Sequence, residues 1–396
     1  MAPGSVHPRM RSELERDFER FKRELPSDVS DHVRETYGID LTARYLGATV
    51  PHPIGKGSGQ LSLNQNQLGD DARAGLAFVV LKTVIAQDEA GSQSMGAWAI
   101  HETKMQVEQR RAAGDRPGWT VTWKGRGWDR SLEEYLALVR AGRDLTRAGS
   151  LLVVPSVKYH LPRLEEPFRD DEYRHTTRLL ADAWGAGAPP LLVEQDFSPT
   201  LAGDALAGDR DQIMRWLREV PDRIRAASFG PVRIAVKLMN ARFDDAFQLA
   251  MMDACTGADA LVAFNRLFDA ERGVAYGGWD LSDRNLRVLD LLRATSPGKS
   301  PPGLCGTGNV CSGRMIVEYA RRGCESVQLH TFFQLPLSEY PATHGSRTQR
   351  ALHVLLFDPS DGLIAALLAL EAAGGLERRD GALHFLDLAA GAHHPG

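Results

Sequence analysis

Length, composition and charge exclude several classes of protein. The chain has 396 residues, of which 43% are hydrophobic and 25% charged, and its formal net charge is -4. No apolar run approaches the ~20 residues of a membrane helix. The weakly acidic balance provides no basic surface for a phosphate backbone, so we expect neither nucleic acid nor a membrane as a partner.

The N-terminal segment and the cysteines indicate a reducing compartment. Residues 1–25 carry charges throughout and contain no apolar segment of signal-peptide type, which predicts a cytoplasmic protein. The four cysteines, Cys255, Cys305, Cys311 and Cys324, form no CxxC pair and show no metal-ligand spacing. We therefore expect reduced thiols, no iron–sulfur cluster and no bound metal.

The chain divides into three predicted parts. Residues 9–25 are typical of a charged surface helix, and the polar segment up to about residue 40 is also predicted to be helical. We expect residues 1–40 to form a helical arm, residues 41–375 the main domain, and residues 376–396 a C-terminal tail. The charged arm and the Ala/Leu-rich segment 361–373 are candidate subunit contacts, and a homodimer is one possible assembly.

From residue 41 onward, short apolar runs alternate with longer amphipathic stretches, as in βα units that build a parallel sheet. The predicted strands are 54–60, 76–83, 150–155, 191–196, 232–238, 259–265, 302–306 and 325–330. The predicted helices are 66–74, 131–146, 170–185, 208–226, 242–255, 281–293, 312–322 and 361–373. Equal numbers of both predict a (β/α)8 TIM barrel, which can exceed ~400 residues as one domain. A doubly wound open sheet is the alternative.

A long insertion follows the second predicted strand. Residues 84–130 show little periodicity, and such a connection without secondary structure of its own is usually a lid or binding loop. Within it, His101 and Glu102 resemble half of a zinc-binding helix motif, but Met105 stands where the second histidine belongs.

A glycine-punctuated turn lies between the seventh strand and its helix, in LCGTGNVCSGRMIVEYARRGCESVQLHT, residues 304–331. A dinucleotide fold would need an acidic residue at the end of the next strand, whereas Glu325 begins that strand. In barrels, the loops after strands 7 and 8 hold phosphate at a helix N-terminus, and amides at Gly306, Gly308 and Asn309 suit that role. A plain tight turn is the alternative.

Polar residues end several of the apolar strands. Lys82 and Thr83 follow strand 2, Lys237 lies near the end of strand 5, and Asn265 and Arg266 follow strand 6. Because lysine is rarely buried without a partner, two lysines at one face indicate an electron-rich ligand such as a flavin. Taken singly, each lysine is equally typical of an ion-paired or snorkelling side chain.

At this point the chain resembles the FMN-dependent dihydroorotate dehydrogenase family, including the related flavin domain of dihydropyrimidine dehydrogenase. The resemblance covers about residues 40–335 and runs in order through DLTARYLGATVPHPIGKGSG, LKT, PVRIAVKL, ADALVAFN, AYGGWDLS and GTGNVCSG…GCESVQLHT. It implies an FMN-binding barrel. The implied cofactor-binding residues are Ser58, Gly59, Lys82, Thr83, Lys237, Asn265, Gly277, Gly278, Gly306, Gly308, Asn309, His330 and Thr331.

The substrate side departs from the family pattern. With the prolines aligned in Glu194-Gln195-Asp196-Phe197-Ser198-Pro199-Thr200, Ser198 takes the position of the catalytic base. Gln195 and Thr200 then replace two substrate-binding asparagines. Shifting the alignment by one residue puts Asp196 at the first asparagine and removes the base, so Asp196 either assists Ser198 or is itself the base. A polar turn without catalytic function is the alternative.

The sequence therefore predicts an FMN-dependent oxidoreductase acting on a C–C or C–N bond of a small, dihydropyrimidine-like substrate that bears a carboxylate or an amide. Arg266 could bind such a carboxylate through two hydrogen bonds, and Asn265 would also contact the substrate. The changed contacts favour specialised metabolism over pyrimidine synthesis. The alternatives are a non-redox barrel lyase, isomerase or binding protein for a phosphorylated ligand, and a partner-binding scaffold. The electron acceptor is not encoded in a visible motif.

Overall fold

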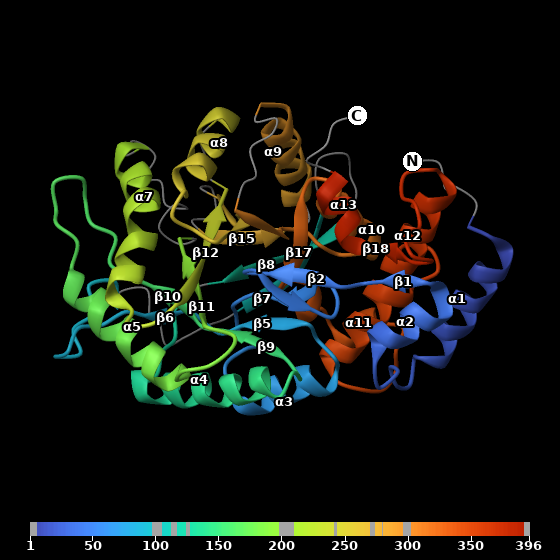
Figure 1. Cartoon of the computed structure of the whole chain (residues 1–396), viewed down its shortest axis with the longest axis horizontal. Coiled ribbons are helices and arrows are strands. Elements are labelled where there is room, and N and C mark those ends of the chain that lie inside the picture. Colours follow the sequence, from blue (N-terminus) through green and yellow to red (C-terminus); the bar gives the residue numbers. More distant parts are fainter. Residues whose placement is uncertain are drawn as a thin grey trace.

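The computed structural model describes residues 6–96, 105–111, 117–123, 127–197, 210–240, 244–269, 274–278, 280–295 and 302–391. It has a mixed α/β architecture with one large parallel sheet, a small antiparallel sheet beside it, and helices packed around both (Figure 1). None of the helices in these ranges combines the length and the apolar character that crossing a bilayer requires.

The large sheet contains ten strands, and every pair of neighbours in it runs parallel. Its strand order is β6-β10-β11-β12-β13-β16-β17-β4-β5-β9. The strands are β4 (Ile54–Lys56), β5 (Phe78–Val80), β6 (Val84–Ile85), β9 (Leu152–Val154), β10 (Ser156–Lys158), β11 (Leu191–Asp196), β12 (Val232–Met239), β13 (Ala260–Asn265), β16 (Gly303–Thr307) and β17 (Cys324–Leu329). The sheet curls, so the fold is barrel-like.

All eight predicted strands are present at their expected places. Two short strands lie beyond the predicted ends of the second and third strands: β6 follows β5, and β10 follows β9 after Pro155, which cannot donate a ladder hydrogen bond. These strands are buried on both faces, which is why they read as continuous apolar runs in the sequence.

All eight predicted helices are present close to their expected bounds. These helices are α3 (Gln65–Arg73), α4 (Leu132–Arg147), α5 (Asp170–Trp184), α7 (Arg210–Ala227), α8 (Asp245–Ala254), α9 (Leu281–Thr295), α10 (Gly313–Ala320) and α12 (Leu363–Ala372). Local sequence explains their starts: Ser131 caps α4 in a capping box with Glu134, and Ser312 caps α10 through the amide of Met315. Helix α11 (Arg347–Phe357) was not predicted.

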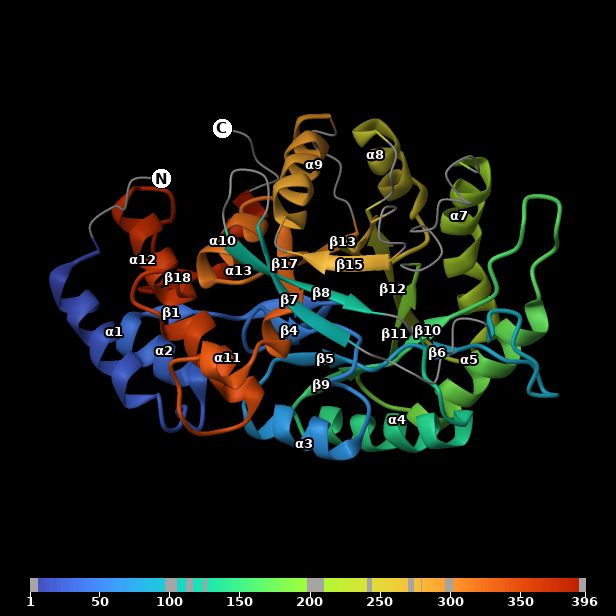
Figure 2. The same ribbon diagram turned by 180° about the vertical axis from the view of Figure 1, so that it is seen from behind.

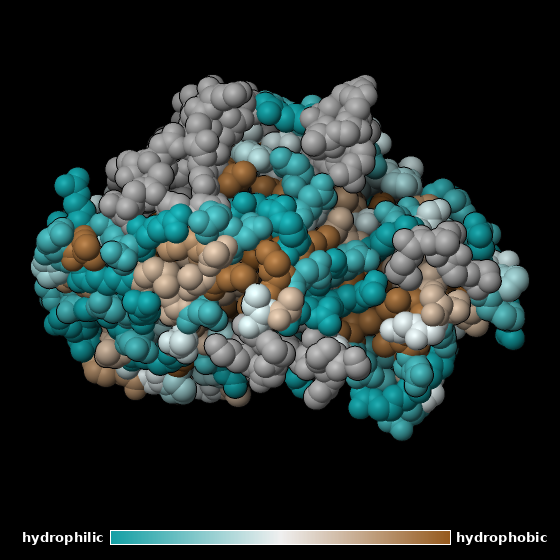
Figure 3. Space-filling model, turned by 90° about the horizontal axis from the view of Figure 1, so that it is seen from above, coloured by the Kyte–Doolittle hydropathy of each residue, from teal (hydrophilic) through white to brown (hydrophobic). Residues whose placement is uncertain are grey.

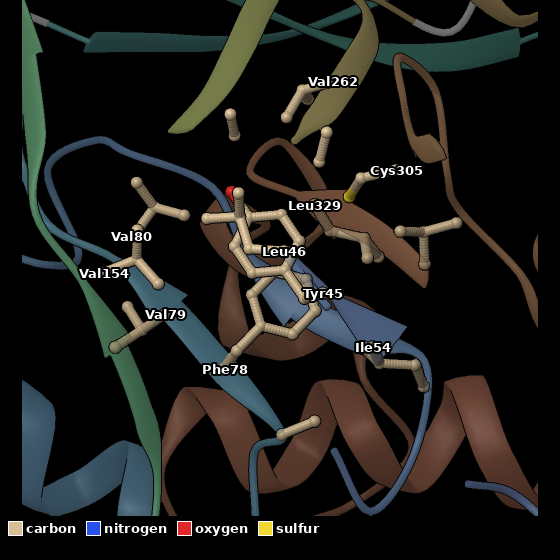
Figure 4. Close-up of a cluster of buried hydrophobic side chains, with 14 of the residues drawn as sticks. Tyr45, Leu46, Ile54, Phe78, Val79, Val80, Val154, Val262, Cys305 and Leu329 are labelled. Atoms are coloured by element: carbon tan, nitrogen blue, oxygen red, sulfur yellow. The ribbon is translucent and has the colours of Figure 1, made fainter. Parts of the chain in front are cut away.

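Apolar side chains fill part of the interior of the curled sheet. Tyr45 of the hairpin β2 (Ala43–Tyr45) and β3 (Ala48–Val50) stacks on Phe78 of β5, with ring centroids 4.2 Å apart. Ile54 and Leu329, from neighbouring strands, pack beside this pair (Figure 4). Close packing here makes the sheet a solid core, so a ligand can bind only at the ends of its strands.

The insertion after the second strand does have secondary structure, which corrects the prediction of a connection without it. Strands β7 (Met105–Arg111) and β8 (Pro117–Trp123) form an antiparallel hairpin, called here the inserted hairpin. β8 also pairs with β15 (Val274–Gly278), and β15 pairs with β14 (Leu267–Asp269), which completes a separate four-stranded sheet (Figure 2). The prediction failed because pairing with the distant β15 is invisible in local periodicity.

The two ends of the chain lie side by side. Helices α1 (Pro8–Arg20) and α2 (Val29–Tyr37) lie beside α11 and α12 in both ribbon views (Figures 1 and 2). β1 (Ile39–Asp40) pairs in parallel with β18 (Leu383–His384), just before α13 (Phe385–Gly391). Leu14 and Val33 belong to the hydrophobic core cluster. The arm is therefore packed against the rest of the chain, and the predicted domain boundaries remain a prediction.

Candidate cofactor and substrate site

A cavity of about 330 Å³ lies where β13, β16 and β17 end. Its walls come from the turn after β16, the segment after β17, the start of α9, and strands β8 and β15 of the small sheet. The lining residues are Gly118, Trp119, Asn265, Gly277, Gly278, Leu281, Thr307, Gly308, Asn309, Val310, Cys311, Gln328, Leu329, His330, Thr331, Phe332, Leu335 and Glu339. Apolar residues gather near the middle of the molecular face in Figure 3. The cavity is large enough for a cofactor-sized ligand.

The turn after β16 has the backbone that an anion cradle requires. Gly308 has φ 95° and Asn309 has φ 53°, so two successive residues adopt left-handed conformations. Asparagine is one of the few residues besides glycine that tolerate this region. The side-chain amide of Asn309 donates to Ser282 Oγ across 2.9 Å, which directs that side chain onto α9. With Ser312 capping α10 just beyond, the turn leads into a helix N-terminus.

Two residues that sequence reasoning missed hold this turn in place. Asn285 of α9 is fully buried, and its Nδ2 donates to the carbonyl oxygens of Phe264 at 2.9 Å and Thr307 at 2.7 Å. The hydroxyl of Tyr319 on α10 donates to the oxygens of Thr307 at 2.8 Å and Gly308 at 2.7 Å. Neither residue belongs to a local motif, so only their contacts across the fold reveal them.

The other glycines of the motif serve packing. Gly306 lies within β16 and does not line the cavity; a Cβ there would lie 2.5 Å from the Tyr319 ring. A Cβ on Gly313 would overlap the backbone of Leu363 at the start of α12. Among Gly306, Gly308 and Gly313, only Gly308 lines the cavity.

The segment after β17 meets the loop after β4. A Cβ on Gly59 would overlap the imidazole of His330, so these two predicted residues are in contact. Burial, together with the nearby cations Arg266, Lys82 and Lys237, holds the pKa of His330 well below its usual range. His330 is therefore neutral at pH 7 and sits in a positive field. Thr331 lies beside it on the cavity wall.

Three hydroxyl groups and one carboxylate cluster where strands β4, β5, β9 and β11 of the large sheet end. Thr83 Oγ1 lies 3.0 Å from Ser58 Oγ and 3.0 Å from Ser156 Oγ, and it donates to Asp196 Oδ2 at 3.2 Å. Asp196 is 3% exposed. The structure thus brings together Ser58, Thr83 and Asp196, which the sequence analysis placed at the cofactor or at the reacting bond.

Lys82 is a buried cation that makes no ion pair or side-chain hydrogen bond with any described residue. It is 4% exposed, and only its backbone amide is bonded, to Ser62. Burial and the charge of Arg266 lower its pKa to about 8, against the opposing effect of Asp196. The lowered pKa is the expected response of an ammonium that is buried without a counter-ion.

Lys237 is held differently. Its Nζ lies 3.2 Å from Glu194 Oε1 and 3.3 Å from Gln328 Oε1, and Glu194 is completely buried. Glu194 Oε2 also accepts from the Tyr45 hydroxyl at 2.9 Å and from Gln328 Nε2 at 2.6 Å. This network was not predicted. Because Gln328 lines the cavity, it connects the cavity wall with the charge on Lys237.

The structure separates Gln195 from the other predicted site residues. Side chains alternate along a strand, so Gln195 points to the face of β11 opposite to Glu194 and Asp196. Its amide is buried, and neither end has a hydrogen-bond partner in the described part of the chain. Asp196 thus occupies the inward position, as in the shifted alignment that places it at the family's first asparagine.

Other predicted substrate residues are only partly described. Asn265 lines the cavity, and Arg266, 6% exposed, follows it directly. Ser198 and Thr200 lie outside the described residues, as do His101 and Glu102. Gly277 and Gly278 line the cavity from β15.

Lys158 is a further residue that the sequence analysis missed. It ends β10, is 1% exposed, and donates from Nζ to the main-chain oxygen of Asp196 at 3.5 Å. The next residue, Tyr159, contacts Thr177 of α5 on the outer face, so Lys158 points inward with Ser156. No motif or spacing in the local sequence marks Lys158 as a residue of the site.

Comparison with known protein sequences identifies no family for this chain. The chain matches no protein-family model, and no curated protein sequence is significantly similar to it. Among the described residues, there is also no group of three or more His, Cys, Asp or Glu side chains that could hold a metal ion.

Proposed function

We propose that the chain is an FMN-dependent oxidoreductase resembling dihydroorotate dehydrogenase. One observation carries the proposal: seven of the thirteen residues that the resemblance implies as cofactor contacts line a single cavity. They are Asn265, Gly277, Gly278, Gly308, Asn309, His330 and Thr331. These residues come from the ends of three strands and from the small sheet. A chance grouping does not explain why all of them line the same cavity.

We further propose that the large sheet closes as a (β/α)8 barrel. The support lies in the pairing at its two ends: β5 pairs with β9 at one end of the strand order, and β6 pairs with β10 at the other. Since β5 and β6 belong to one stretch of chain, and β9 and β10 to another, the same two stretches meet at both ends. Such closure would bring all strand ends onto one catalytic face.

The residues present suit a flavin with a phosphate tail. The left-handed pair Gly308 and Asn309 leads into the N-terminus of α10, as a phosphate requires. Lys82, buried and without an ion pair in the described residues, suits the electron-rich ring. The cavity volume of about 330 Å³ lies within the usual range for small-molecule sites, about 300 to 1,000 Å³.

When bound, FMN would supply the capacity to accept or donate a hydride. The protein's own residues would orient the ligand and handle the accompanying proton. Asn285 and Tyr319 hold the phosphate turn rigid, and Lys82 provides positive charge near the ring. Asp196, oriented by Thr83, is the described carboxylate placed to receive a proton.

On the substrate side we propose a small dihydropyrimidine-like molecule bearing a carboxylate or an amide, oxidised or reduced at a C–C or C–N bond. Arg266 and Asn265 support this, because a guanidinium next to an amide can bind a carboxylate and a ring carbonyl. Asp196 in place of an asparagine supports a substrate other than orotate. Normal turnover of dihydroorotate would contradict this part.

The first test is the visible absorption spectrum of the purified protein, with release and identification of any chromophore. A flavin spectrum with FMN released would support the redox function. A colourless protein that also refuses added FMN would overturn it and leave a binding protein, lyase or isomerase for another phosphorylated ligand.

A second test separates the two candidate bases. If Asp196 is the base, Asp196→Asn should abolish substrate-dependent flavin reduction, while Ser198→Ala should retain most of it. The opposite pattern would assign the proton to Ser198. Flavin content of each variant serves as the control, since neither change should empty the cofactor cavity.

A further inference from the structure

The cofactor cavity has a wall that the barrel itself does not provide. Gly118 and Trp119 of β8 line it, and so do Gly277 and Gly278 of β15. β8 and β15 are antiparallel neighbours, with Thr120 opposite Gly278. The connection after the second strand and the connection after the sixth thus build one roof over the cavity.

Trp119 is the large side chain of this roof. It is partly exposed and packs against the hydrophobic core. The cavity wall also carries Leu281, Phe332 and Leu335, so the hollow has an apolar part in addition to its anion cradle. An indole beside such a hollow can cover a planar or aliphatic portion of a ligand at little cost in side-chain entropy.

The two glycines of β15 pair with the residues that follow Trp119 in β8: Gly278 is opposite Thr120, and Gly277 is opposite Val121. A Cβ on Gly278 would lie 3.0 Å from Thr120 Oγ1 and 3.1 Å from the Tyr276 ring. A side chain at Gly278 would therefore crowd Thr120 and Tyr276. The pairing of β8 with β15 runs as far as Gly278 and Thr120, and Trp119 follows it directly at the cavity wall.

We propose that Trp119 is a cofactor-binding residue, and that the inserted hairpin, through this residue, forms a roof that retains FMN. The inference rests on the proposed function, because it takes FMN as the occupant. It goes beyond that function by assigning cofactor retention to the insertion rather than to the barrel. The roof is held in place by the pairing of β8 with β15. FMN binding to the roof and the β8–β15 pairing should therefore stabilise each other.

The chain offers a matched control in the same hairpin. Gln109 pairs directly with Trp119 across β7 and β8, but it is exposed and does not line the cavity. Trp119→Ala removes the indole from the cavity, Trp119→Phe keeps an aromatic ring, and Gln109→Ala changes the hairpin without touching the cavity. Unfolding midpoints of the apoproteins show whether each variant folds.

The experiment titrates FMN into each apoprotein and follows both flavin fluorescence and the rate of FMN release. We expect Trp119→Ala to raise the Kd and the release rate about tenfold, Trp119→Phe to raise them less, and Gln109→Ala to leave them unchanged. Hydrogen exchange gives an independent readout. FMN should slow exchange of the amides in residues 117–123 in the wild type and much less in Trp119→Ala.

Two results would overturn the inference, and they are distinguishable. If the wild type binds FMN, and folded Trp119→Ala and Trp119→Phe bind and release it like the wild type, the roof assignment is wrong and the proposed function stands. If the wild type binds no FMN, the proposed function itself fails, and this inference fails with it.

Discussion

Lys237 and Glu194 form an ion pair inside the curled sheet, with Nζ and Oε1 3.2 Å apart and side chains 5% and 0% exposed. The charge on Lys237 is thereby largely balanced within the protein. Lys82, at the same end of the sheet, has no ion pair with a described residue. The two lysines that looked equivalent in the sequence therefore differ in their partners within the described part of the chain.

Breaking the Lys237–Glu194 pair should destabilise the fold strongly. Glu194→Gln would leave a buried ammonium without its carboxylate, at a cost of roughly 3–5 kcal/mol in the free energy of unfolding. Chemical denaturation measures this. As a control, Asp70→Asn removes the exposed partner of Arg73 and should cost no more than about 1 kcal/mol. Equal losses from the two changes would contradict the buried-pair argument.

Replacing Lys82 should stabilise the apoprotein while weakening cofactor binding. Its pKa is about 8 in the fold and 10.5 ordinarily, so the unfolded chain holds the proton more tightly. At pH 7 this costs the wild type up to about 3 kcal/mol, which Lys82→Met should recover. The variant's advantage should shrink as pH rises from 8 to 10.5. A variant less stable than the wild type at pH 7 would contradict this account.

The same titration predicts a pH dependence of FMN affinity. Above pH 8, free Lys82 loses its proton and with it the charge that suits an electron-rich ring. The Kd for FMN, measured by fluorescence between pH 7 and 9.5, should rise in the wild type. Lys82→Met should bind more weakly at pH 7 and should lack this rise. Parallel pH profiles in both proteins would place the titrating group elsewhere.

A side chain at Gly308 should disrupt the phosphate turn. Its φ of 95° disfavours any L side chain, and a Cβ would press against the amide of Asn285. We expect Gly308→Ala to cost about 1–3 kcal/mol of stability and to lower FMN affinity at least tenfold. Gly374→Ala has a similar φ of 70° with open space around it, so it should lose some stability but no affinity. Unchanged binding by Gly308→Ala would exclude this turn as the phosphate site.

Asn285 should matter for binding although it does not line the cavity. Asn285→Ala leaves the buried carbonyls of Phe264 and Thr307 without this donor, at about 1–3 kcal/mol for each group left unsatisfied. Loss of the donor should loosen the turn and weaken FMN binding. Calorimetric titration of the folded variant measures the effect. Wild-type affinity would show that the hydroxyl of Tyr319 alone holds the turn.

The sequence by itself located most strands of the parallel sheet, because burial on both faces favours apolar runs. The short strands β6 and β10 lie outside the predicted ranges. The sequence also located the turn at Gly308 and Asn309, since left-handed backbone restricts residue type. Tertiary structure decided the rest. The pairing of β8 with β15, the contact of Asn285 with Thr307, and the partnership of Lys237 with Glu194 join residues far apart in the chain. Which face of β11 carries Asp196 rather than Gln195 depends on strand register, and only packing against neighbouring strands fixes register.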